Sequence, residues 1–239
     1  MSEQTNNEQP SDGPVQYSER DGVALIVLDD GKANALSHDL LDQLDAALDR
    51  AENASAIVIA GRPGKFCAGF DLSVVQLGRA EASALMEKGA KVALRLHTWP
   101  KPRVLAVTGH ALAMGAVLLA CADIRIGTPG GFKIGFNEVG IGLPMPEFAN
   151  ELHRGRLSPR HFHQAVALAR IYDPAGAVEA GFLDRLAEGD VIDDAVATAA
   201  ELAGRLDPTA LAITRRTLDR ELTERLVGLT SGWADDANM

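Results

Sequence analysis

Two short segments rich in small residues, and one carboxylate, carry the chemistry that this sequence allows. Lys65 to Leu72 follows a β-like run, and Thr108 to Gly115 lies between another such run and an apolar helical stretch. Backbone N–H groups in such turns, where a starting helix leaves them unpaired, can point at a developing negative charge. Glu138, which follows Asn137, supplies a carboxylate that can move a proton. Together these features indicate oxyanion stabilisation combined with proton transfer.

Each feature also has a purely structural explanation. The segment around Gly69 fits a tight strand-to-helix turn, and Gly109 to Gly115 fits a packing device at a buried helix start. Glu138 lies in apolar company, which predicts a raised pKa, although a surface or capping role stays open. His110 is adjacent to the second turn and is either a structural histidine or an alternative acid or base.

Strands and helices must alternate to position these segments. A helix is predicted after Ser37, which is a suitable N-cap, and another from Glu81 to Thr98. Aliphatic runs predict strands at Val23 to Leu28, Ala56 to Ala60, Arg103 to Thr108 and Asp123 to Gly127. This alternation predicts an α/β fold with a largely parallel sheet.

After Pro146 the pattern changes to successive helices. The last of them is predicted from Pro208 to Leu229, and its leucine stripe is either core packing or a subunit contact. We therefore expect a disordered tail over residues 1–14, a core over 15–190, and a C-terminal helical region over 191–239 that makes an oligomer contact. The stripe consists of Leu211, Leu218, Leu222, Leu226 and Leu229.

The composition is that of an ordinary soluble globular domain, with 239 residues of which 46% are hydrophobic and 23% charged. The formal net charge of −10 disfavours nucleic acid and anionic membrane surfaces as partners. Cys67 and Cys121 lie in apolar settings, which predicts free buried thiols in a reducing compartment. No metal-ligand spacing is found. The polar start of the chain favours a cytoplasmic location.

In order and spacing, the three chemical segments resemble the crotonase (enoyl-CoA hydratase/isomerase) family. The likeness extends from about Val15 to Leu186 and includes Gly31 to Leu36, where the family turns its backbone toward the CoA adenine. It implies the crotonase spiral of ββα units followed by a helical C-terminal region. It also implies an acyl-CoA substrate, no separate cofactor or metal, and a homotrimer or a dimer of trimers.

The resemblance assigns roles to individual residues. The oxyanion donors correspond to the backbone N–H groups of Phe70 and Met114, and Glu138 corresponds to a proton-transferring glutamate of the family. The family usually has glycines around the second donor, whereas this chain has Ala113-Met114-Gly115. The implied contacts to CoA and the thioester fall on Ala33, Ala35, Ala68, Gly69, Asp71, Leu72, Ser73 and Gly115.

Val117 occupies the position of a second glutamate that hydratases of the family use. Valine cannot transfer a proton, whereas converting a 3-enoyl-CoA to a 2-enoyl-CoA needs only one base. The sequence therefore favours double-bond isomerisation with Glu138 as the base. Two alternatives are weak or specialised hydration of 2-enoyl-CoA and non-catalytic binding of acyl-CoA. RNA binding, known for some relatives, is disfavoured by the net charge of −10.

Overall fold

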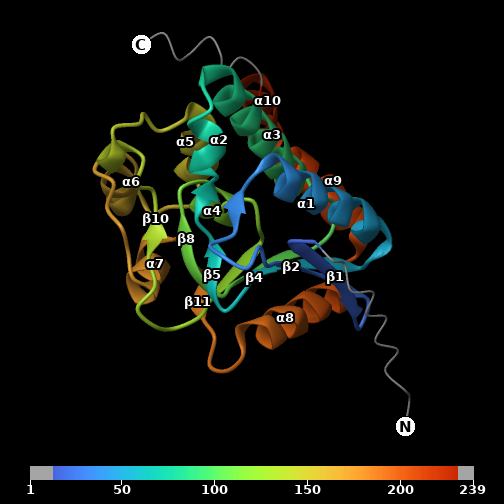
Figure 1. Ribbon diagram of the computed structural model, residues 1–239. Helices are drawn as coiled ribbons and strands as arrows, with labels where there is room; N and C mark the ends of the chain where they lie inside the picture. The colour runs from blue at the N-terminus through green and yellow to red at the C-terminus, as the bar shows by residue number, and fades with distance from the viewer. Residues whose placement is uncertain (1–12, 231–239) are drawn as a thin grey trace.

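A six-stranded sheet forms the centre of the fold in the computed structural model, which describes residues 13–230 (Figure 1). β1 pairs antiparallel with β2, and all other neighbours are parallel. Each predicted strand is present, with ends that move by at most one residue, so the predicted α/β class is confirmed. In spatial order the strands are β1 (Val15–Arg20), β2 (Val23–Leu28), β4 (Ala56–Gly61), β7 (Arg103–Val107), β9 (Ile124–Gly127) and β11 (Arg185–Leu186). Most of the expected tail, residues 1–12, lies outside the described residues, as do residues 231–239.

Two smaller parallel sheets contain most of the two segments, residues 65–72 and 108–115, that were predicted to provide backbone donors. One consists of β10 (Ile134–Gly135), β8 (Gly109–Leu112) and β5 (Gly64–Cys67), and the other of β3 (Ala35–Leu36) and β6 (Gly69–Phe70). The chain passes directly from β7 to β8 at a corner where the backbone of Gly109 lies against the backbone of Gly64. A Cβ on Gly109 would lie 2.0 Å from the carbonyl carbon of Gly64, so only glycine fits this corner.

Helices cover both faces of the six-stranded sheet. The buried side chains of α8 pack on one face with those of β2, β4 and β7, whereas α1, α3 and α4 share the larger core on the other face (Figure 1). No helix within residues 13–230 combines the length and the hydropathy needed to cross a bilayer. The helices are α1 (His38–Arg50), α2 (Leu72–Val75), α3 (Arg79–His97), α4 (Met114–Leu119), α5 (Glu147–Arg154), α6 (Pro159–Val166), α7 (Pro174–Ala180), α8 (Val191–Arg205), α9 (Pro208–Leu218) and α10 (Arg220–Leu229), with 3-10 turns η1 (Ala51–Asn53) and η2 (Val139–Ile141).

Local sequence signals account for the ends of α1, α2 and α3, the helices next to the segment of residues 65–72. The Ser37 hydroxyl accepts a hydrogen bond from the N–H of Leu40 at 3.2 Å, which confirms the predicted N-cap of α1. The Asp71 carboxylate caps α2 in the same way, accepting from the N–H of Ser73 at 2.8 Å. α3 ends at His97, before the predicted stop at Trp99-Pro100.

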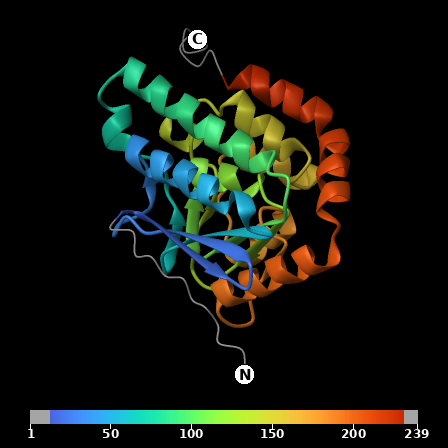
Figure 2. The same cartoon turned by 90° about the vertical axis from the view of Figure 1, so that its right-hand side faces the viewer.

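The prediction of one helix from Pro208 to Leu229 is wrong, because the chain breaks at Asp219 into α9 and α10. After this break α10 lies against α5 and α3 of the same chain (Figure 2). Leu226 is completely buried there, while 79% of Leu218 is exposed. The Arg225 side chain also donates to a Glu151 carboxylate oxygen at 2.9 Å, which ties α10 to α5. The leucine stripe is therefore divided, with its α10 half in the chain's own core.

Leu226→Ala is expected to lower the free energy of unfolding by about 3 kcal/mol, because it leaves a cavity in a packed core. The matched control is Leu168→Ala, which removes the same atoms from a side chain that is 65% exposed and should change this free energy by less than about 0.5 kcal/mol. Urea denaturation of both variants measures the difference. Equal losses would contradict the packing of α10 on its own chain.

Candidate active site

The backbone N–H of Phe70 faces away from the neighbouring strand. Asp71, the next residue, donates its N–H to the carbonyl of Leu36 in β3 at 3.0 Å. Successive N–H groups of an extended strand point to opposite edges. The Phe70 N–H is therefore directed to the other edge of β6.

Met114 is the first residue of α4, so its N–H has no carbonyl partner within the helix. Ala113 immediately before it adopts φ 51° and ψ −126°, a conformation that costs a non-glycine residue about 1–3 kcal/mol. A Cβ placed on Gly69 would lie 3.4 Å from the Met114 nitrogen and 2.6 Å from the Ala113 Cβ. The two predicted donor segments are thus in direct contact.

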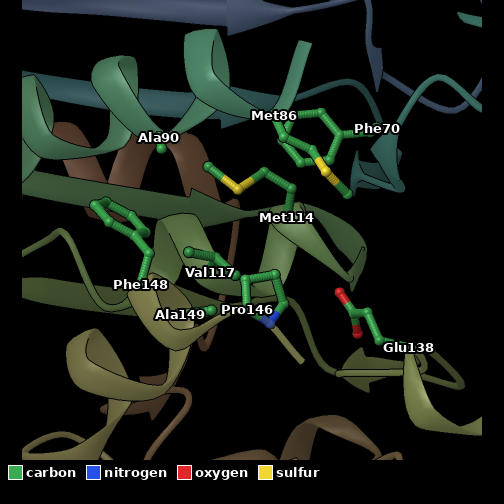
Figure 3. A pocket seen from close by; sticks show the side chains of 9 residues that line it. All are labelled: Phe70, Met86, Ala90, Met114, Val117, Glu138, Pro146, Phe148 and Ala149. Atoms are coloured by element: carbon green, nitrogen blue, oxygen red, sulfur yellow. The ribbon is translucent and has the colours of Figure 1, made fainter. Parts of the chain in front are cut away.

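A small apolar pocket, with a cavity of about 20 Å³, is lined by Phe70 and Met114, the two predicted donor residues. This is room for one or two water molecules. Figure 3 shows the Glu138 carboxylate on one side of the pocket and the apolar side chains on the other. Glu138 is the one ionisable residue among those lining it, which are Phe70, Met86, Ala90, Met114, Val117, Glu138, Pro146, Phe148 and Ala149.

Burial raises the pKa of the Glu138 carboxyl, and hydrogen bonds from the backbone N–H groups of Glu138 and Asn137 act in the opposite direction. Its Oε2 atom is buried without a hydrogen-bond partner within residues 13–230. The Glu138 carbonyl accepts from the N–H of Ile141 at 3.0 Å and of Leu143 at 2.9 Å, which holds the residue at the start of η2. The site therefore presents a positioned carboxyl group whose second oxygen is free to accept a proton.

Val117 faces the same pocket from α4, one helical turn after Met114. Only 3% of its surface is exposed, and its methyl groups contribute to the apolar wall in Figure 3. Among the described residues that line this pocket, Val117 therefore adds an aliphatic side chain and none adds a second carboxylate.

The residues expected to contact CoA and the thioester gather around β3 and β6, outside the pocket lining. The Ala68 N–H donates to the Ala33 carbonyl at 3.1 Å, and Ala35 pairs with Gly69. Leu72 begins α2 with 58% of its surface exposed.

Two further expected contact residues have structural functions at these turns. Besides capping α2, the Asp71 carboxylate accepts from the Ser73 hydroxyl at 2.7 Å. Gly115 lets α4 approach β5, since a Cβ there would lie 2.2 Å from the Cys67 carbonyl oxygen. Packing thus explains the glycine at position 115.

Asn34 is a structural anchor of this region that the sequence analysis did not single out. Its fully buried side chain donates to the carbonyls of Leu28 at 2.8 Å and Lys65 at 2.9 Å, and its oxygen accepts from the N–H of Asp30 at 3.0 Å. Its φ of 55° is one that asparagine tolerates better than most residues. An Asn directly before a short strand was the available signal.

Gly89 is a second residue that was missed. A Cβ at this position would lie 2.5 Å from the Phe70 ring and 3.7 Å from the Met114 methyl group. Glycine in the interior of a helix is unfavourable by itself, so its presence within α3 was the signal for a close contact.

The contacts of His110 are those of a structural histidine. Its Nδ1 accepts a hydrogen bond from the N–H of Lys133 at 3.0 Å, and its ring packs edge-on against Phe132. It does not line the Glu138 pocket.

Cys67 and Cys121 are buried free thiols, as predicted. Across the described part of the chain, no three His, Cys, Asp or Glu side chains are grouped so as to hold a metal ion.

Comparison with known proteins agrees with this geometry. The sequence profile described as enoyl-CoA hydratase/isomerase matches residues 18–232. The chain belongs to this family. A Mycobacterium tuberculosis protein, described as an enoyl-CoA isomerase in one solved structure and as a probable enoyl-CoA hydratase in another, superposes in the first with a TM-score of 0.88 at 37% identity, covering 95% of this chain and 99% of that one. The predicted crotonase fold is confirmed, and the protein is an enzyme of the enoyl-CoA hydratase/isomerase family.

The names of sequence relatives include both reactions of the family. "Probable enoyl-CoA hydratase" of Bacillus subtilis is 32% identical over 202 residues, which are 80% of this chain and 76% of that protein. The mitochondrial enoyl-CoA delta isomerase 1 of Mus musculus is 28% identical over 178 residues, 72% of this chain and 61% of that protein. Similarity therefore establishes the family, and the choice of reaction has to come from the site.

An aromatic cluster supports the segment that carries Glu138. Phe136 packs edge-on against His153, with 4.8 Å between ring centroids, and against Phe182. The His153 Nδ1 hydrogen-bonds the Ala149 carbonyl at 3.0 Å and must therefore be the protonated ring nitrogen. Burial lowers the pKa of His153 to about 4, so the ring is neutral at physiological pH.

Ala113→Gly is expected to raise the free energy of unfolding by about 1 kcal/mol, because relief of the strained backbone exceeds the added entropy of the unfolded chain. Ala113→Val adds a β-branched side chain at the same φ and should lower it by about 2 kcal/mol. Thermal unfolding of the two variants measures both changes. If Val is tolerated as well as Gly, Ala113 is not strained in solution.

Acidification is expected to destabilise the fold through His153. Unfolded histidine takes up a proton below about pH 6.5, whereas the folded residue, with a pKa of about 4, does not. Between these values each such histidine removes roughly 1.4 kcal/mol of stability per pH unit. His97, whose pKa burial also lowers to about 4, adds to the loss. Urea unfolding at about pH 6 and about pH 5 measures it.

Glu138 has the opposite pH dependence, because a raised carboxyl pKa lets the folded state bind a proton before the unfolded state does. The measurement is therefore made in Glu138→Gln, where this contribution is absent. A stability that does not fall between the two pH values in this background would contradict neutral, buried histidines.

Proposed function

We propose that this enzyme isomerises 3-enoyl-CoA to 2-enoyl-CoA thioesters, with Glu138 carrying the proton. One observation supports this reaction most directly. The pocket beside the two backbone donors is lined by a single ionisable residue, Glu138, and Val117 occupies the position at which hydration would need a second carboxylate.

The thioester carbonyl oxygen would accept hydrogen bonds from the backbone N–H groups of Phe70 and Met114. Glu138 would remove a proton from C2, and the resulting negative charge would spread onto the thioester oxygen as a dienolate. Each backbone donor would lower the barrier by about 3–4 kcal/mol. The same carboxyl group would return the proton at C4, which completes the shift of the double bond.

The environment of Glu138 suits this transfer. Its raised pKa brings the carboxyl group closer to neutrality and makes its ionised form a stronger base. Hydration would instead require a water molecule held by polar partners, and the other residues lining the pocket are apolar. Met86 and Met114 line the pocket across from Glu138 (Figure 3), so an acyl chain would enter by displacing these flexible side chains.

Weak or specialised hydration is the second candidate, supported by the name of the Bacillus subtilis relative. Assembly as a homotrimer or a dimer of trimers is part of the same proposal. Its contact would fall on the exposed apolar residues of α9, a helix that buries none of its residues in the chain itself. Ile213 and Leu218 offer the exposed apolar side chains there.

Glu138→Gln is expected to slow proton shuttling by about 10²–10⁴-fold, because the amide keeps the shape of the carboxyl group but cannot act as the base. Affinity for butanoyl-CoA should change little, since the backbone donors remain. Turnover of 3-enoyl-CoA in heavy water, with deuterium located at C2 and C4 by mass spectrometry, measures the rate. In the wild type, kcat/KM should rise with pH through a pKa above the usual range for glutamate.

The control is Glu147→Gln, the same substitution on an exposed residue at the start of α5, which should leave turnover unchanged. Efficient hydration of 2-enoyl-CoA, no deuterium exchange and tolerance of Glu138→Gln would together refute the isomerase proposal. Binding of butanoyl-CoA with no turnover of either substrate would instead indicate a non-catalytic acyl-CoA-binding protein.

A further inference from the structure

A second and larger cavity, of about 410 Å³, lies where the end of α3 meets the corner between α9 and α10. It shares no lining residue with the Glu138 pocket. Its volume is in the range of small-molecule sites. Its walls are formed by His97, Thr98, Pro100, Ala212, Arg215, Arg216, Asp219, Arg220, Thr223 and Glu224.

Positive charge is concentrated around this cavity in a chain whose formal net charge is −10. Three arginines line it, and Arg103 and Arg156 lie close enough behind the wall to act electrostatically on His97. The opposing carboxylates are Asp219 and Glu224 in the lining and Asp123 behind it. The five arginines thus exceed the three carboxylates by two charges.

Only some of these arginines are engaged within the fold. The Arg215 guanidinium donates to the carbonyls of Trp99 at 2.7 Å and Lys101 at 2.6 Å, and it also pairs with Asp123. Arg216 and Arg220, one helical turn apart in sequence, make no hydrogen bond or ion pair with any residue between 13 and 230. Arg215 is therefore a fixed wall of the cavity, and the other two are available to a ligand.

His97 is the polar group that the fold leaves unsatisfied. Only 4% of its surface is exposed, yet neither ring nitrogen has a hydrogen-bond partner within the described residues. A neutral imidazole carries one N–H donor and one acceptor. Leaving such groups buried and unpaired is costly, so a partner within the cavity is expected.

We propose that this cavity binds a small organic oxyanion that also carries hydroxyl groups. The phosphate or carboxylate group would accept hydrogen bonds from Arg216, Arg220 and the N–H of His97. Charge-assisted bonds of this kind are the strong ones. The hydroxyl groups would donate to Asp219 and Glu224, which would otherwise repel the anion. The volume exceeds what a single inorganic ion fills, which favours an organic molecule over free phosphate.

Calorimetric titration of the full chain with ribose 5-phosphate and, separately, with citrate tests this site and distinguishes phosphate from carboxylate ligands. We expect saturable binding of at least one probe, weakened by salt. Arg216→Gln combined with Arg220→Gln should raise its dissociation constant by roughly 10-fold or more, because two charge-assisted contacts are lost. Arg205→Gln, which removes an exposed arginine on α8, is the matched control and should leave binding unchanged.

A second readout locates the ligand at His97. Its ring resonances in an NMR titration should shift with the same dissociation constant, while those of exposed His163 should not. The proposal fails if neither probe binds at millimolar concentration, or if the double variant and the control bind equally. It also fails if the double variant changes the oligomeric mass, because the cavity would then be part of a subunit contact.

Discussion

The close approach of two backbone segments is the constraint on which this site depends. Gly69 and Ala113 lie so near each other that a side chain on Gly69 would collide with the Ala113 Cβ. Both residues have positive φ, and this conformation brings the Phe70 segment to the first turn of α4. Because the proposed donors are backbone groups, their side chains can vary, but the path of the chain between them cannot.

The surrounding sheets hold that approach in place. The Phe70 segment pairs with β3, and β8, which leads into α4, pairs with both β5 and β10. Asn34 links the loop before β3 to β5 through its buried amide. Gly89 provides the gap in α3 that accommodates the Phe70 ring. A strained residue such as Ala113 can persist only where its neighbours are fixed in this way.

Sequence patterns predicted those elements whose signals are local. Buried aliphatic runs identified β2, β4, β7 and β9, and Ser37 identified the start of α1. β1 was missed because its residues are mostly polar, although the Asp21-Gly22 turn, with φ of 52° and 76°, is typical of a hairpin. The strands of the small sheets have two to four residues, which is too short for periodicity to appear.

In the candidate site, too, some features had a signal in the sequence and others had none. The segments containing Phe70, Met114 and Glu138 could be recognised from residue order, and the structure brings them around one pocket. The strain at Ala113 could not, because alanine gives no signal of a positive φ. The break at Asp219 was also hidden, since no proline or glycine lies between Leu211 and Leu226.

That break has consequences beyond helix length. An uninterrupted helix would continue in the direction of α9, whereas the turn at Asp219 brings Leu226 into the chain's own core. The same turn forms the corner that faces His97 and encloses the larger cavity. α3 then contributes to both cavities, since Ala90 lines the Glu138 pocket and His97 lies about 10 Å further along the helix axis. The packing of α10 against α3 and α5 therefore shapes one cavity directly and supports the helices that form the other.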